Sequence, residues 1–211
     1  MGVAKLGLSL FVEHGPRAVE EFLRRGAKVF LDLKLHDIPN TVELAAARAG
    51  ALGVAYLTVH ASGGSAMVKA AVEGAASGAA KAGHPAPIIL AVTVLTSMDE
   101  AALHEVGVAA RASDQAQALA DLAVRAGATG LVCSAREVGA VRARVGQKIV
   151  LCTPGIRPAG TAANDQARTE TPGAAIQAGS DLLVIGRPIT TAADMVAAAK
   201  AIEAEVSISV R

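Results

Sequence analysis

The sequence has 211 residues and a formal net charge of +1, with 18% charged and only 2% aromatic residues. This balance provides neither a basic surface nor a stacking platform, so we expect no nucleic-acid partner. The longest apolar stretches, such as residues 88–95, are too short to cross a bilayer, and the N-terminus enters a strand-like run directly, so we expect a cytoplasmic protein without membrane segments.

Short apolar segments rich in β-branched residues alternate with longer alanine-rich segments of helical period. Strands are predicted at residues 3–8, 28–33, 56–60, 88–94, 130–133, 149–153 and 182–185. Helices are predicted at residues 16–25, 40–52, 65–81, 113–126, 136–144, 172–178 and 190–205.

Strand and helix alternate in units of about 30 residues, which predicts an α/β protein with a parallel sheet and favours a (β/α)8 TIM barrel. A flavodoxin-like open sheet is the structural alternative. We expect a single domain over residues 1–211, because no linker or low-complexity segment interrupts the pattern. The two cysteines, Cys133 and Cys152, lie in apolar runs without metal spacing, which indicates free buried thiols in a reducing cytoplasm.

The segment from Phe30 to Thr41 carries charges in an otherwise apolar strand. Asp32 and Lys34 are two residues apart, so they point to the same side of a strand. Asp37 follows where the residue before proline, Ile38, ends the extended run. An ordinary ion pair, with Asp37 capping the next helix, is the structural interpretation. A functional role for these charges is the better interpretation, because a buried ion pair is seldom more stabilising than an apolar pair.

In a barrel, the active site lies where strands end and loops begin. The strand ends carry mostly polar residues: Lys5, Asp32, Lys34, Asp37, His60, Thr96, Ser134, Pro154 to Arg157, and Gly186 with Arg187. Gly186, Arg187 and a helix expected to begin near Thr190 predict a phosphate site, together with Arg157 one strand earlier.

Several motifs follow one another in a known family order. They are Lys5-x-Gly7, Asp32-Leu-Lys34-Leu-His-Asp37-Ile-Pro-Asn-Thr41, Val59-His-Ala61, Leu95-Thr-Ser97, Val132-Cys-Ser134, Thr153-Pro-Gly-Ile-Arg-Pro158, Asp165-Gln166 and Val184-Ile-Gly-Arg-Pro188. Over nearly the whole chain they resemble the bacterial form of the orotidine 5'-phosphate decarboxylase family. The segment from Asp32 to Thr41 is the most specific of them.

The resemblance implies cofactor-free decarboxylation of orotidine 5'-monophosphate to uridine 5'-monophosphate in de novo pyrimidine biosynthesis, by a homodimer with shared active sites and no metal. By this resemblance, Lys34 is the general acid that protonates C6, and Asp32 faces the departing carboxylate. Lys5 and Asp37 complete an alternating charge array, in which Asp37 and Thr41 reach into the partner subunit's site. Alternating charges keep one another ionised.

The remaining implied residues bind the substrate. Thr96 matches the position that contacts the pyrimidine, and the phosphate contacts match Arg157, Gln166, Gly186 and Arg187. Ile38, Pro154 and Lys5 are further expected substrate contacts. Outside this set, we expect His60 to be a hydrogen-bonded histidine at the barrel end, His36 to face outward, Asp99 and Glu100 to occupy the first turn of a helix, and Ser134 to cap the helix that follows it.

Two other functions remain open on these residues. One is a magnesium-dependent decarboxylase of the 3-keto-gulonate-6-phosphate type, which the segment from Ile38 to Thr41 disfavours. The other is a non-catalytic binder of nucleotide phosphates. The family begins with a further strand that ends in aspartate, so the first βα unit is expected to be missing from this sequence, either by truncation or as a real gap in the barrel.

Overall fold

The computed structural model describes residues 2–158 and 170–209, and it divides into two compact units. The first unit comprises residues 1–92 and 121–131, and the second comprises residues 93–120 and 132–211. Parallel strands alternate with helices in both, so the predicted α/β class is confirmed.

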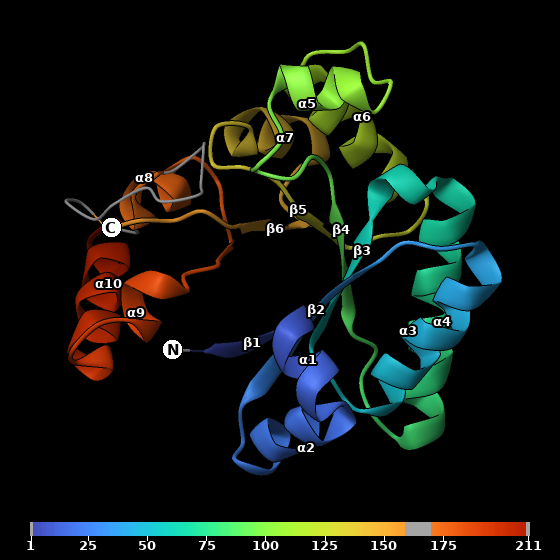
Figure 1. Ribbon diagram of the computed structural model, residues 1–211, viewed down its shortest axis with the longest axis horizontal. Helices are drawn as coiled ribbons and strands as arrows, with labels where there is room; N and C mark the ends of the chain where they lie inside the picture. Colours follow the sequence, from blue (N-terminus) through green and yellow to red (C-terminus); the bar gives the residue numbers. More distant parts are fainter. Residues whose placement is uncertain (1, 159–169, 210–211) are drawn as a thin grey trace. The chain divides into compact units, whose positions relative to one another are not determined.

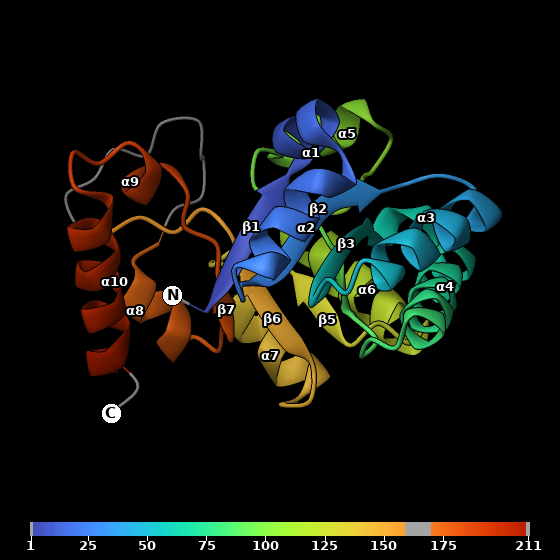
Figure 2. The ribbon, with the colours of Figure 1, turned by 90° about the horizontal axis from the view of Figure 1, so that it is seen from below.

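The first unit carries the N-terminal strands. Its elements are β1 (Val3–Gly7), α1 (Leu8–His14), α2 (Pro16–Arg24), β2 (Lys28–Leu35), α3 (Pro39–Ala51), β3 (Tyr56–His60), the 3-10 helix η1 (Ala61–Gly63), α4 (Ser65–Ala82) and β4 (Ile88–Val92). Strands β1 to β4 pair in parallel and in chain order, and Figure 2 shows β1, β2 and β3 side by side.

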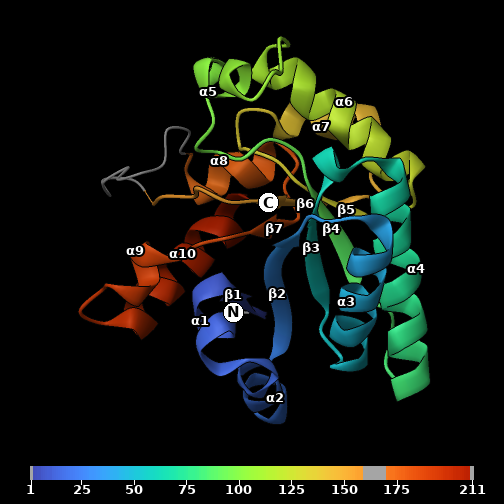
Figure 3. The same ribbon diagram turned by 45° about the vertical axis from the view of Figure 1, so that its right-hand side comes forward.

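The second unit carries the C-terminal elements. They are α5 (Glu100–Glu105), α7 (Val138–Val145), β6 (Val150–Thr153), α8 (Pro172–Gln177), β7 (Leu182–Leu183), α9 (Arg187–Thr190) and α10 (Met195–Ser209). Helix α6 (Ala112–Arg125) and strand β5 (Gly130–Val132) cross from one unit to the other along the chain. Strands β6 and β7 pair in parallel, and α10 packs on α8 and α9 (Figure 3).

Helices α3 and α4 pack closely along their length (Figure 1), and small residues make this possible. A Cβ atom on Gly74 would lie 2.3 Å from the carbonyl oxygen of Glu43, and one on Gly78 would lie 1.9 Å from that of Ala47. Glycine inside a helix costs about 1 kcal/mol relative to alanine. The backbones of the two helices approach so closely at Gly74 and Gly78 that only glycine fits there.

The apolar faces of the strands form the core. The large side chains that are fully buried include Leu6 on β1, Val29 and Leu31 on β2, Leu57 on β3 and Leu90 on β4. Both cysteines, Cys133 and Cys152, are free and buried, as predicted. Among residues 2–158 and 170–209, no helix has both the length and the apolar character that crossing a membrane requires.

Three predicted features differ from the structure. Helix α1 was not predicted, and its N-cap, Gly7, has no side chain to mark the start. The helix predicted at residues 190–205 is instead the short α9 and the longer α10, because the Asp194 carboxylate accepts a hydrogen bond from the Ala197 N–H and starts a new helix.

Ser134 was predicted to cap α7, but the N-cap is Glu137, and the Ser134 hydroxyl donates to the Glu137 carboxylate at 2.7 Å. The helix expected at Asp99 and Glu100 is confirmed as α5.

Candidate active site

Strand β2 bulges where its charged residues lie. Leu31 pairs with Leu57 of β3, but the next pair is Leu35 with Val59, so four steps along β2 face two steps along β3. Inside this bulge Lys34 has a φ of 48°, the only positive φ at a non-glycine residue among the residues that the structure describes. Such a backbone is strained for a residue with a Cβ and is found most often at functional sites.

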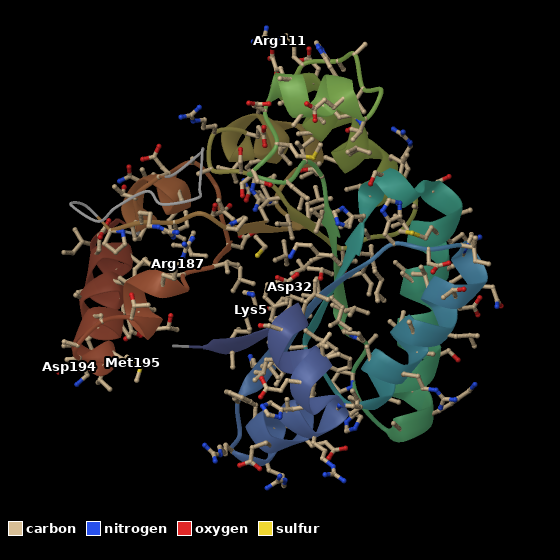
Figure 4. All side chains as sticks on the ribbon, viewed as in Figure 1. Lys5, Asp32, Arg111, Arg187, Asp194 and Met195 are labelled. Carbon is tan, nitrogen blue, oxygen red and sulfur yellow. The ribbon has the colours of Figure 1, made fainter. Side chains whose placement is uncertain are left out.

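Asp32 lies at the centre of a cluster of three charged side chains. Lys34 Nζ is 2.8 Å from Asp32 Oδ1 and 3.0 Å from Oδ2, and Lys5 Nζ is 3.3 Å from Oδ2. Figure 4 shows Lys5 on β1 beside Asp32 on β2. The Asp32 side chain is only 11% exposed, whereas those of Lys5 and Lys34 are 34% and 32% exposed. The carboxylate is therefore shielded, while the two ammonium groups border on solvent.

The neighbours of Asp32 keep it ionised. Burial alone would raise the pKa of its carboxyl, but the hydrogen bond and charge of Lys34, the charge of Lys5 and a hydrogen bond from Thr58 together hold that pKa below its ordinary value. The cluster therefore presents a negative charge held between two cationic side chains.

Thr58 on β3 is a member of this cluster that the sequence analysis missed. Its hydroxyl donates to Asp32 Oδ1 at 2.9 Å and accepts from the Lys34 N–H at 2.9 Å. Thr58 is buried. A threonine within a strand normally indicates only strand propensity, and its one distinguishing signal was its place two residues before His60 at the strand end.

Asp37, Ile38 and Thr41 lie beyond the bulge and are exposed. The Asp37 carboxylate accepts a hydrogen bond from the Ile38 N–H at 2.7 Å, and within the described residues it does not join the cluster around Asp32. Ile38 is 66% exposed, although it is a large apolar residue.

The two histidines beside the cluster form a pair. The rings of His36 and His60 lie 5.4 Å apart between centroids, with His36 exposed and His60 half-buried. Burial, with the charges of His36 and Lys34, lowers the pKa of His60, while Asp32 opposes this shift. His36 faces outward as predicted. The contact of His60 in the structure is this ring pair with His36. The hydrogen bond expected for His60 therefore remains a prediction.

The residues expected to contact the pyrimidine and the phosphate belong to the second unit. Thr96 and Pro154 are half-buried. Arg157 is buried, its Nη1 donates to the Ile156 carbonyl at 2.9 Å, and its Nε has no hydrogen-bond partner among the residues that the structure describes. A buried polar atom without a partner is costly, which makes this guanidinium a candidate to receive an anion.

Gly186 and Arg187 lie where β7 leads into α9. A Cβ atom on Gly186 would have no described atom within 4 Å, and Arg187 is exposed as the first residue of α9 (Figure 4). The predicted helix start near Thr190 is wrong, because α9 begins at Arg187, with Gly186 as its N-cap, and α10 begins at Met195. Gln166, the other predicted phosphate contact, lies outside the described residues.

No group of three or more His, Cys, Asp or Glu side chains that could hold a metal ion occurs within residues 2–158 and 170–209. The cluster around Asp32 instead combines one carboxylate with two ammonium groups and a hydroxyl. Such a set suits electrostatic stabilisation and proton donation at a reacting carbon.

Comparison with known proteins connects this site to one family. A family model described as the orotidine 5'-phosphate decarboxylase / HUMPS family matches residues 2–202. The orotidine 5'-phosphate decarboxylase of Anaeromyxobacter sp. (strain K) is 56% identical over 204 residues, covering 97% of this chain and 86% of that protein. The enzyme of the same name from Thermobifida fusca (strain YX) is also 56% identical over 204 residues, covering 95% of this chain and 83% of its own length.

A solved structure shows the same similarity in three dimensions. The crystal structure of orotidine 5'-phosphate decarboxylase from Lactobacillus acidophilus has a TM-score of 0.85 and 41% sequence identity, covering 96% of this chain and 85% of that one. This similarity confirms the predicted (β/α) barrel class over an open flavodoxin-like sheet.

Proposed function

This chain belongs to the orotidine 5'-phosphate decarboxylase / HUMPS family, and we propose that it converts orotidine 5'-monophosphate to uridine 5'-monophosphate and CO2 in de novo pyrimidine biosynthesis. The observation that carries this proposal is the cluster in which Lys5 and Lys34 flank the buried Asp32 carboxylate. The reaction uses neither a metal ion nor an organic cofactor.

The reaction breaks the bond between C6 and the carboxylate, and the electron pair stays on C6. The ammonium of Lys34 stabilises the negative charge that develops there and then donates a proton to C6, so that a C–H bond replaces the C–C bond. Lys34 regains its proton from solvent, which its partly exposed side chain reaches. Asp32, held ionised by its neighbours, faces the departing carboxylate and disfavours the bound ground state.

The remaining predicted substrate contacts are residues of the second unit. Thr96 contacts the pyrimidine, Pro154 is a further substrate contact, and Gly186, Arg157 and the Arg187 guanidinium bind the phosphate together with Gln166. The buried Arg157 Nε supports this assignment, because it has no partner within the described part of the chain and a phosphate oxygen would supply one. Phosphate binding far from C6 contributes energy that the enzyme uses for orientation and closure.

The active enzyme is a homodimer in which each site includes residues of both subunits. Asp37 and Thr41 reach into the partner's site, and Ile38 contacts the substrate beside them. Their exposure supports this arrangement, as does the exposure of the apolar side chains of Ile38 and Leu44, which a subunit interface would bury. A cytoplasmic location is part of the same proposal, and the two free buried thiols agree with it.

The direct test follows the loss of absorbance of orotidine 5'-monophosphate on addition of the purified protein, with and without a chelator. We expect turnover that the chelator does not change. Turnover of 3-keto-gulonate 6-phosphate that a chelator abolishes would assign the magnesium-dependent reaction instead. Binding of orotidine 5'-monophosphate without product would identify a non-catalytic binder.

A further inference from the structure

Thr58 makes two hydrogen bonds that meet at the reacting residues. It lies on β3, is 1% exposed, and is separated by 26 residues from Asp32 and by 24 residues from Lys34 along the chain. Its hydroxyl has one hydrogen, which it donates to Asp32 Oδ1, and a lone pair, which accepts the Lys34 N–H. One side chain therefore fixes the carboxylate of one residue and the backbone of the other.

The bulge explains why a hydroxyl is needed at this position. The register shift between Leu31 and Leu35 interrupts the regular ladder between β2 and β3 where Lys34 lies, and the Lys34 N–H bonds to the Thr58 hydroxyl of β3. A buried N–H without a partner costs about 1–3 kcal/mol. The Thr58 hydroxyl accepts this N–H at 2.9 Å and so stabilises the left-handed backbone of Lys34.

We propose that Thr58 is a positioning residue for the decarboxylation, acting through Asp32 and Lys34 without touching the substrate. This inference rests on the proposed function. Lys34 Nζ reaches its place from a backbone with φ 48°, and Asp32 presents its oxygens to both lysines while Thr58 holds Oδ1. Small displacements of a proton donor reduce rates strongly, because the donor must stay within reach of C6 in the transition state.

The test compares Thr58→Val, which keeps the shape and removes both hydrogen bonds, with Thr58→Ser, which keeps the hydroxyl. Thr58→Val is expected to lower kcat about 10- to 100-fold, the effect of losing a hydrogen bond to a charged group, with little change in KM. Thr58→Ser is expected to retain most of the activity. The matched control is Thr93→Val, which removes another buried hydroxyl, bonded at 3.0 Å to the Val132 carbonyl, and should leave kcat unchanged.

A second readout does not depend on turnover. The carboxyl carbon of Asp32, followed by NMR across acidic pH, should titrate at a higher pH in Thr58→Val than in wild type, and Thr58→Ser should restore the wild-type value. Should Thr58→Val fail to fold, Thr58→Cys, with its weaker hydrogen-bonding thiol, is measured by the same two criteria.

The outcomes separate this inference from the proposed function. A wild-type protein inactive on orotidine 5'-monophosphate overturns the proposed function, while the shift of the Asp32 titration still decides whether Thr58 holds the carboxylate. An active wild type with equal kcat in wild type and Thr58→Val overturns the role of Thr58. The same conclusion follows if Thr93→Val loses as much kcat as Thr58→Val, since the loss would then be a general effect of a buried hydroxyl.

Discussion

In the cluster of Lys5, Asp32 and Lys34 each charged group already has a partner within the protein, whereas Arg157 of the second unit has a buried Nε without a partner among residues 2–158 and 170–209. The cluster is assembled by folding, with the Thr58 hydroxyl bonded to both Asp32 and Lys34. The guanidinium of Arg157 donates to the adjacent carbonyl, and within the described residues its Nε retains capacity for an anion.

This difference separates two tasks of an enzyme. Groups that stabilise a transition state work best when they are held in place before the substrate arrives, because no reorganisation is then required during the reaction. Groups that capture a ligand need unused hydrogen-bonding capacity, and binding supplies the missing partner. Substitutions in the two regions should therefore affect different kinetic constants.

The largest effect is expected from removing Lys34, the proposed proton donor of the cluster. Lys34→Ala should lower kcat by at least about 10⁴-fold, because in the proposed mechanism it removes both the general acid and the cation beside C6. The measurement is the turnover of orotidine 5'-monophosphate, with folding checked by thermal unfolding. Lys69→Ala, an exposed lysine of α4 paired with Glu73, is the control and should behave as wild type. A tenth of wild-type activity in Lys34→Ala would remove Lys34 from this role.

Subunit mixing extends the comparison to the exposed Asp37. Asp37→Ala and Lys34→Ala proteins are each expected to be nearly inactive. If Asp37 serves the partner's site, a mixed dimer has one site with both lesions and one with neither. Equal mixing should then recover about a quarter of wild-type activity, since half of the dimers are mixed and half of their sites are intact. Mixed dimers verified by mass spectrometry but without recovered activity would place Asp37 in its own subunit's site.

A smaller and more selective effect is expected in the second unit. Arg187→Ala should lower kcat/KM for orotidine 5'-monophosphate by about 10²- to 10³-fold, because the guanidinium no longer meets the phosphate dianion. The bare nucleoside orotidine presents no dianion, so its slow turnover should change little. The comparison of the two substrates is the measurement. Equal losses of kcat/KM for both substrates would show that Arg187 does not bind the phosphate.

The sequence predicted those parts of the site that depend on local periodicity. Asp32 and Lys34 share a strand, so their common side followed from the alternation of side chains. The bulge and the positive φ of Lys34 could not be predicted in this way, because they arise from pairing with β3, whose residues lie more than 20 positions away. Thr58 was missed for the same reason.

The fold was predicted well where apolar segments are long and bounded by clear signals. Strand β3 has the predicted bounds, Tyr56–His60, and helix α4 (Ser65–Ala82) ends one residue beyond the prediction. Helix α1 was missed because a short segment of mostly apolar residues does not distinguish a helix from a strand and no capping side chain marks its start. The division between α9 and α10 was missed although Asp194 carries a capping side chain, because the alanine-rich segment around it has helical composition throughout.

The central claim is that Lys34 transfers a proton to C6, and exchange at C6 of the product tests it most directly. By microscopic reversibility, a group that protonates the C6 carbanion also removes a proton from C6 of uridine 5'-monophosphate. Wild-type protein in D2O is expected to replace the C6 hydrogen with deuterium, and the loss of the C6 proton NMR signal measures this exchange. With Lys34→Ala the exchange rate is expected not to exceed the rate without protein. Exchange by Lys34→Ala at the wild-type rate would contradict the claim.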